Sequence, residues 1–189
     1  VPEALMAALE RRYLAEGEPR NITAIHPVGL GDSKTLGANH FAHEGLLKRI
    51  VAGTFVNSPK ISDLAIADKI EGYTLPQGAM SQLMREIAAG RAGLLTQTGL
   101  HTFVDPRHGG GRLNAAATDD LVDVIRIDGE EFLRYKPMPI HCALVRGTTA
   151  DARGNISCED EPFHHELLAI AQAAHNSGGI VIGTTFRRQ

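Results

Sequence analysis

The sequence predicts an α/β protein whose mainly parallel sheet is covered by helices on both faces. Segments with helical periodicity alternate with short β-branched segments along most of the chain. The 20 glycines cluster at the ends of expected strands, which is typical of loops that approach a ligand closely. One Asp-Gly step between alternating apolar residues predicts a single β-hairpin at 124–135. Ligands of such sheets bind beyond the carboxyl ends of the strands.

Length and composition set bounds on the function. The 189 residues suffice for one sizeable core, and 43% hydrophobic and 22% charged residues are ordinary values. The net charge of −3 argues against nucleic-acid and membrane partners, and no apolar run reaches the roughly 18 residues of a membrane helix. Cys142 and Cys158 form neither a zinc pattern nor a disulfide framework, so a cytoplasmic location is expected. We expect one α/β domain over 1–189, incomplete at both ends.

In the first half of the chain, apolar spacing and breaker residues predict alternating helices and strands. Apolar residues recur at helical spacing over 3–15, and Gly17 ends that helix. Ser58 and Pro59 are typical of a capped helix start. The expected elements are a helix at 3–15, a strand at 21–25, a helix from 43 that runs into a strand near 50–55, a helix at 59–70, a strand at 71–75 and a helix at 76–90.

The second half begins with "TGLHTFVDPRHGGGRLN", residues 98–114, whose four glycines exclude a helix or strand interior. After the hairpin, we expect a strand from 140 that becomes a loop at "RGTTAD", a short return strand at "GNIS", and a helix from "HHELL" that leads through glycines into a last strand. Loops that follow expected strands are predicted to converge on one rim: 29–32, 76–78, 98–106 and 146–151.

Two glycine-rich motifs resemble known sites but lack essential parts. "HGGG" at 108–111 matches the oxyanion loop of some lipases, yet the chain has no G-x-S-x-G nucleophile motif. "GLGDSK" at 29–34 begins like a dinucleotide fingerprint, but Lys34 occupies the place of the last glycine and no acidic residue follows about 20 positions on. We therefore favour a turning loop in the first case and close approach to some other ligand in the second.

Histidines and carboxylates offer a weaker case for a site. His40 and His43, three residues apart, and the "HHE" at 164–166 do not form H-E-x-x-H, so solvated or helix-capping histidines are favoured over a metal site. "CEDEP" at 158–162 could hold a shielded nucleophilic carboxylate. A solvated charge run ahead of a helix is the favoured interpretation.

The segment "TLPQGAM", residues 74–80, combines a strand end with a proline-initiated helix. Gln77 then lies where the first helical amides have no partner. A side-chain amide beside free N–H groups can bind a carboxylate or a thioester oxygen. An ordinary helix start is the alternative, and both remain open from these residues alone.

Taken together, these segments resemble the amino-terminal half of family I CoA-transferases, and within that family the single-chain acetate or propionate CoA-transferases. "PQG" is shared with 3-oxoacid CoA-transferases, whereas "TFVDPR" followed by "GG" is more particular to the acetate/propionate group; His101 stands where that group has glycine. The resemblance extends from about 20 to 182 and rests on these segments: "PRNITAIHPVGLGD", "EGLLKRIVAG", "SPKISDLAIADKIEGYTLPQGAMSQLMREIAAG", "TGLHTFVDPRHGGGRLN" and "IAQAAHNSGGIV".

The resemblance implies ping-pong transfer of CoA between a short-chain acyl-CoA and a carboxylic acid, through a glutamyl-CoA thioester. It places the catalytic glutamate in the carboxyl-terminal half, and neither Glu159 nor Glu161 matches that motif, so no catalytic residue is assigned here. The family's first strand and its G-x-G-G turn are also absent, and "GTTFRRQ" departs from the usual continuation. We interpret the chain as part of a longer enzyme that leans on its other segments or on another chain.

The implied substrate-binding residues are Gln77, Gly78, Thr98, Gly99, Gly29 and Gly31, with the 98–114 loop as a wall of the site. No metal is expected, and no cofactor other than the CoA thioester as substrate. The implied partners are acyl-CoA, a short-chain carboxylate, the glutamate-bearing half and further copies of the chain. The alternatives are a non-catalytic ligand-binding or regulatory module on the same fold and a citrate-lyase-type transferase subunit. We expect Gly99→Val to block substrate binding without unfolding the domain.

Overall fold

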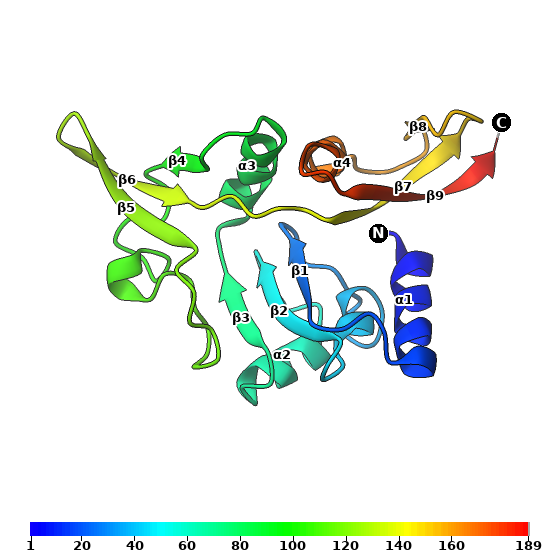
Figure 1. The fold of residues 1–189 in the computed structure, drawn as a ribbon, viewed down its shortest axis with the longest axis horizontal. Helices are drawn as coiled ribbons and strands as arrows, with labels where there is room; N and C mark the ends of the chain where they lie inside the picture. Colours follow the sequence, from blue (N-terminus) through cyan, green and yellow to red (C-terminus); the bar gives the residue numbers. More distant parts are fainter. Residues whose placement is uncertain (189) are drawn as a thin grey trace.

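The computed structural model describes residues 1–188 and confirms the α/β class (Figure 1). The helices are α1 Glu3–Glu16, α2 Pro59–Ile66, α3 Gln77–Ala88 and α4 Leu167–Asn176, with short 3-10 helices η1 Ala38–Phe41 and η2 Pro106–His108. The strands are β1 Ile22–His26, β2 Leu47–Ala52, β3 Glu71–Thr74, β4 Leu94–Thr96, β5 Val122–Ile127, β6 Glu130–Tyr135, β7 Cys142–Ala150, β8 Ile156–Ser157 and β9 Ile180–Arg188.

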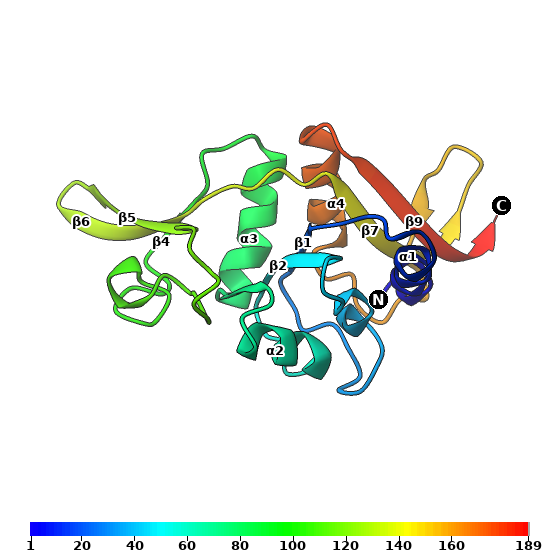
Figure 2. The ribbon, with the colours of Figure 1, turned by 60° about the horizontal axis from the view of Figure 1, so that its bottom comes forward.

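The strands form three small sheets rather than one continuous sheet among the described residues. The first sheet, β1-β2-β3, is parallel throughout, the second, β4-β6-β5, is antiparallel, and the third, β8-β7-β9, pairs β7 with β9 in parallel and with β8 antiparallel. Figures 1 and 2 show the hairpin sheet at one end of the molecule and the β7–β9 sheet at the other, with α3 and α4 side by side between them.

The parallel sheet positions the candidate site. Because β1, β2 and β3 are parallel, their carboxyl ends lie at the same edge. Its two faces are buried in different cores: Ile50 packs with α1, α2 and η1, whereas Val51 packs with Tyr73, α3, α4 and the other strands. Burial of both faces holds this edge in a fixed position.

The expected helix from 43 is wrong, because the chain there forms a turn and then β2. Gly45 has φ +86°, a left-handed conformation that interrupts any helix. Leu46, Leu47, Ile50 and Val51 are all fully buried, and their spacing imitated one helical face. They are buried because β2 is the central strand, with both of its faces covered.

The helix expected at 59–70 ends at Ile66, and Asp68 adopts φ +53°. Pro59 occupies the first turn as predicted, but Ser58 makes no capping hydrogen bond. The Ser58 hydroxyl instead donates to the carbonyl oxygen of Leu30 at 2.5 Å. This serine therefore ties the start of α2 to the loop after β1.

The other expected elements largely agree with the structure. The apolar face of α3 is buried as its spacing predicts, and the hairpin forms around Asp128 and Gly129, both at positive φ. Helix α4 begins at Leu167 rather than at the histidines before it. The "RGTTAD" segment is mostly strand rather than loop: β7 continues to Ala150 because it pairs with both β8 and β9.

Strand β9 is an edge strand with apolar side chains in solvent. It pairs with β7 on one side and with no other strand of residues 1–188. Ile180 is 60% exposed and Val181 42%, although strand residues of this type are usually covered. The expectation that the chain packs against other segments or another chain stays a prediction. The exposed edge of β9 is the surface where we expect that packing.

Candidate functional site

The carboxyl ends of β1, β2 and β3 meet at a tightly packed rim. Gly53, which follows β2, lies between the ends of the two flanking strands. A Cβ atom at Gly53 would be 2.1 Å from the carbonyl oxygen of Pro27 and 2.3 Å from Cγ of Gln77. The absence of a side chain at Gly53 therefore lets the loops after β1 and β3 approach each other.

The loop after β1 carries Gly29 and Gly31, which both face the β2–α2 connection. A Cβ atom at Gly29 would contact the side chains of Thr54 and Asn57, and one at Gly31 would lie 2.0 Å from the carbonyl oxygen of Asn57. Both glycines are only partly buried. The predicted close approach exists, and the groups approached in this structure are backbone and side chains of the protein itself.

Asp32 organises the outer part of the same loop. Its Oδ1 accepts hydrogen bonds from the amides of Lys34, Thr35 and Leu36 at 2.8–2.9 Å. These bonds, that from Leu36 foremost, lower the pKa of Asp32 from its ordinary value. The acidic residue of "GLGD" is thus committed to holding its own loop.

Gln77 and Gly78 begin α3 directly beside this rim, and both are exposed. The first bond of the helix runs from the Met80 amide to the Pro76 carbonyl oxygen, so the amides of Gln77, Gly78 and Ala79 have no partner within the helix. The arrangement expected from "PQG" is present: a side-chain amide next to free N–H groups at the positive end of a helix dipole.

Gly78 provides a test of whether the fold itself requires glycine at the start of α3. A Cβ atom there would have no neighbour within 4 Å, and the residue does not have positive φ. We expect Gly78→Ala to raise the free energy of unfolding by about 0.5–1 kcal/mol, because alanine is the better helix former. Chemical denaturation measures this change; a destabilised variant would contradict it.

Thr98 and Gly99 follow β4, a strand of the antiparallel sheet, and lie against Tyr135 at the end of β6. The Tyr135 hydroxyl donates to the Thr98 carbonyl oxygen at 2.8 Å, and burial raises the pKa of Tyr135 to about 12. Gly99 has φ +101°, and its Cβ atom would lie 2.6 Å from that hydroxyl. Gly99→Val would therefore strain the loop itself, so it does not separate substrate binding from folding as we expected.

The 98–114 loop is a rigid wall attached to β3. Its last part runs antiparallel to that strand: the Thr74 amide donates to the Gly111 carbonyl oxygen at 2.8 Å, and the Leu113 amide to the Gly72 carbonyl oxygen at 2.9 Å. The loop is thereby fixed beside the strand that leads into Gln77. Of the four loops predicted to converge, those at 29–32 and 76–78 meet at the rim, 98–106 is anchored through its continuation, and 146–151 lies in another sheet.

Asp105 holds the loop together from inside. Its side chain is fully buried and pairs with Arg107 through both oxygens, Oδ1–Nε at 2.9 Å and Oδ2–Nη2 at 2.7 Å. The amides of His101 and Arg107 also donate to it at 3.0 Å. The bonds from Arg107 hold the pKa of Asp105 far below its usual range. The sequence pattern "VDPRHGGG" did not reveal this role, although a lone Asp-x-Arg in a glycine-rich loop is a signal for it.

The acidic run "CEDEP" is exposed at Glu159 and Asp160, as the solvated interpretation expects, but its side chains also make specific contacts. Glu159 accepts from the Thr149 hydroxyl at 2.5 Å, Asp160 pairs with Arg187, and Glu161 pairs with Arg146 at 3.0 Å. Hydrogen bonds, with Ser157 foremost, lower the pKa of Glu159 to about 2. These carboxylates tie their loop to β7 and β9 and lie away from the rim.

Within residues 1–188, no group of three or more His, Cys, Asp or Glu side chains is arranged to hold an ion. His40 and His43 are not solvated caps, however, because both bond to carboxylates of α1. The described helices are also too short and too polar to cross a bilayer.

His26, the last residue of β1, is a buried group that the sequence analysis missed. It is 5% exposed, and its Nδ1 lies 2.7 Å from the Val28 carbonyl oxygen, so Nδ1 carries the proton. Burial lowers the pKa of His26, and its buried Nε2 has no hydrogen-bond partner. A neutral His26 therefore holds the Val28 carbonyl group at the start of the loop after β1.

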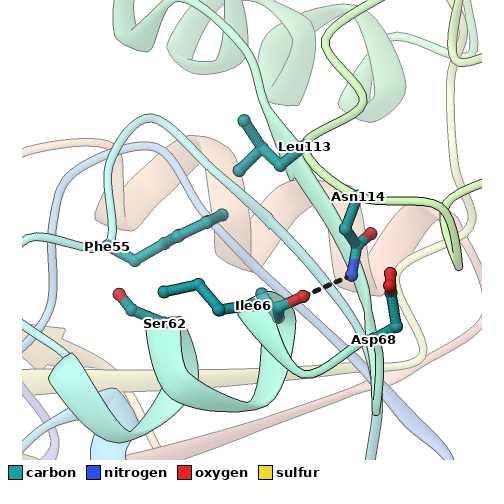
Figure 3. Close-up of a pocket in the computed structure, with 7 residues that line it drawn as sticks. Phe55, Ser62, Ile66, Asp68, Leu113 and Asn114 are labelled. Carbon is teal, nitrogen blue, oxygen red and sulfur yellow. Dashed lines mark hydrogen bonds between the residues drawn. The ribbon is translucent and has the colours of Figure 1, made fainter.

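A cavity of about 370 Å³ lies between α2 and the end of the 98–114 loop (Figure 3). Phe55, Ile66 and Leu113 converge on it, and Asn114 closes one side by donating to the carbonyl oxygens of Ala65 and Ile70 at 2.8 and 2.7 Å. Its lining residues were not among those predicted from the sequence.

The class of protein follows from this fold and from the sequence. The sequence matches the family described as Coenzyme A transferase over residues 1–183, and the chain belongs to that family. It is 43% identical over 178 residues to "Acetate CoA-transferase YdiF" of Escherichia coli O157:H7, which covers 94% of this chain and 34% of that protein. It is 44% identical over 181 residues to "Caffeate CoA-transferase" of Acetobacterium woodii, with 96% and 34% covered.

A solved structure, the acyl-CoA transferase YdiF of E. coli O157:H7 in a thioester complex with CoA, matches with a TM-score of 0.95 and 41% identity. The match covers 98% of this chain and 38% of that chain. The chain thus spans about a third of the length of the curated relatives that it matches. The resemblance stated from the sequence is confirmed.

Proposed function

We propose that this chain forms the substrate-facing rim of an enzyme that transfers coenzyme A from a short-chain acyl-CoA, such as acetyl- or propionyl-CoA, to a carboxylic acid. The observation that carries the proposal is the Gly53 contact, which brings the loop after β1 against Gln77 at the open start of α3. Relatives of this chain are named as acetate and caffeate CoA-transferases, and one is described as a thioester complex with CoA.

In the proposed reaction, a glutamate outside this chain attacks the acyl carbonyl and displaces CoA thiolate, leaving a mixed acyl-glutamyl anhydride. The thiolate then attacks the glutamyl carbonyl, which releases the free carboxylate and forms a glutamyl-CoA thioester. The incoming carboxylate reverses both steps and leaves as the new acyl-CoA. Because each step exchanges one acyl derivative for another, the thioester energy is retained as long as water is excluded.

The role proposed for this chain is to bind and orient oxygens. The Gln77 amide and the free N–H groups of Gly78 and Ala79 are the donors available to a carboxylate or to a developing oxyanion. Gly29 and Gly31 belong to the loop beside them, and Thr98 and Gly99 belong to the 98–114 loop, whose last part pairs with β3. The chemistry needs no metal or prosthetic group, with the CoA thioester entering as substrate. The glutamate-bearing half, and further copies of the chain, are the proposed partners.

A transfer assay on the full-length protein tests this function. Acetyl-CoA and propionate are mixed with the protein, and propionyl-CoA is followed. Incubation with acetyl-CoA alone should give a covalent adduct whose mass corresponds to CoA less one water, and hydroxylamine should remove it. Propionyl-CoA without such an adduct would contradict the ping-pong route, and the absence of both would favour a non-catalytic binding module.

Gln77→Ala is expected to lower kcat/KM by about 10²–10³-fold, the loss typical of one oxyanion donor. The side chain is exposed at the first helical position, so the free energy of unfolding should change by less than about 0.5 kcal/mol. Steady-state kinetics with acetyl-CoA and propionate measure the effect. Gln82→Ala, an exposed glutamine on the same helix, is the matched control and should behave as wild type.

A further inference from the structure

A chain of hydrogen bonds joins α1 to η1 and to the loop at 29–37. Nε2 of His40 lies 2.7 Å from Oε1 of Glu3, and Nδ1 of the same ring lies 2.5 Å from Oε2 of Glu10. Both ring nitrogens face carboxylates, which only accept, so the doubly protonated imidazolium satisfies both bonds. The His40 side chain is 12% exposed, so water provides little substitute for either partner.

The second oxygen of Glu3 continues this chain into the substrate-facing loop. Oε2 of Glu3 accepts the Gly37 amide at 3.0 Å. Gly37 pairs with Gly31 as an isolated β-bridge, and a Cβ atom at Gly37 would lie 2.6 Å from the Gly31 Cα. Gly31 and Gly37, the two ends of one loop, therefore meet where Glu3 accepts the Gly37 amide. Gly31 is one of the predicted substrate-binding glycines.

We propose that His40 is a positioning residue for the candidate substrate site: its imidazolium fixes Glu3, and Glu3 fixes the Gly31–Gly37 closure of the loop at 29–37. The effect on substrate binding rests on the proposed function. The effect on the order of the loop does not, because it follows from the contacts alone.

This arrangement has a pH window with a defined sign. Glu3 and Glu10 face His40 from α1, and His43 faces the other oxygen of Glu10 at 2.7 Å. Burial alone would lower the pKa of His40, but its bonds to Glu10 and Glu3 outweigh this and raise the pKa. The contribution of His40 is therefore complete below its ordinary pKa of 6.5 and is lost as the pH rises through the raised value.

The acid side of the window belongs to Glu10. Burial alone would raise the pKa of Glu10, and its bonds to His40 and His43 lower it overall. Its contribution is complete above its ordinary value of 4.5 and is lost as the pH falls through the lowered value. The loop should be held most firmly between these two limits, in mildly acidic to neutral solution.

Hydrogen exchange in the full-length protein tests the first part of the inference. After correction for intrinsic rates, peptides covering 31–38 should exchange about tenfold faster above the pKa of His40 than at pH 6, the size expected for one lost charge-assisted bond. His40→Gln should exchange at the fast rate at both pH values. Arg12→Ala, which removes an exposed ion pair with Glu16 on the same helix, is the matched control and should behave as wild type.

The pH dependence of the wild-type protein keeps the test valid even if His40→Gln folds poorly. Wild-type exchange from 31–38 that does not change with pH would overturn the proposal. So would a folded His40→Gln variant that protects this segment as well as wild type does.

Kinetics test the second part. His40→Gln should raise KM for acetyl-CoA about tenfold and change kcat less than about twofold, since the loop binds and does not react. It should also remove the rise in KM at alkaline pH that we expect for the wild type. An equal loss of kcat would indicate general damage and overturn the positioning role. If the wild type transfers no CoA, the proposed function fails while the exchange experiment still decides the role in the loop.

Discussion

Gly53→Ala is expected to give the largest loss at the rim, in both stability and activity. The added Cβ atom would lie 2.1 Å from the Pro27 carbonyl oxygen and 2.3 Å from Gln77 Cγ, distances that no real Cβ atom tolerates. The Pro27 carbonyl oxygen is backbone of the loop after β1 and cannot move aside as a side chain can. Overpacking of this kind costs about 1–3 kcal/mol or more, measured by chemical denaturation.

The same substitution should lower kcat/KM by on the order of 10²-fold, because it displaces Gln77 by about an ångström. Gly78→Ala is the matched control. It adds the same methyl group at the start of α3, where the space is open, and should not destabilise the protein. A Gly53→Ala protein with wild-type stability and activity would show that the β1, β2 and β3 ends do not depend on each other.

Asp105→Ala is expected to produce the largest loss in the 98–114 loop. It removes four hydrogen bonds to a fully buried carboxylate and leaves the His101 and Arg107 amides without their acceptor. The free energy of unfolding should fall by about 2–4 kcal/mol, toward the lower end because Arg107 is 43% exposed and can be hydrated. Chemical denaturation and proteolytic cleavage within 98–114 both report the change.

Glu131→Gln is the control for this variant. It removes the other ion pair of Arg107, at 2.9 Å and open to solvent, and should cost less than about 1 kcal/mol. The pKa of Asp105 is depressed, so its contribution is complete above the ordinary value of 3.8 and is lost only as the pH falls through the depressed value. Equal losses in Asp105→Ala and Glu131→Gln would mean that burial of Asp105 adds nothing.

Local sequence patterns correctly predicted the elements that depend on residues close together in the chain. The apolar face of α3, the Asp128–Gly129 hairpin and the glycine end of α1 each depend on neighbours a few residues away, and each is confirmed. The start of α3 at "PQG" belongs to the same group, because proline and the unpaired amides define a helix start locally.

The errors fall where distant segments decide the outcome. The apolar residues of 46–51, Leu46, Leu47, Ile50 and Val51, are buried between β1, β3 and two cores, and their spacing imitated a helical pattern. "RGTTAD" became strand because β8 and β9 supply its hydrogen bonds, and the partly exposed "CEDEP" run forms ion pairs with Arg146 and Arg187. Such partners have no signature within the segment itself.

The sequence by itself determined the α/β class, most element positions and, through resemblance, the CoA-transferase family. Only the tertiary structure decided how the strands divide into three sheets, which loops meet at the rim, and which contacts Gly53, Asp105 and His40 make. The physical reason is the range of the interactions: periodicity and capping act over one or two turns. Steric contact, buried ion pairs and strand pairing instead join residues that the chain brings together only when it folds.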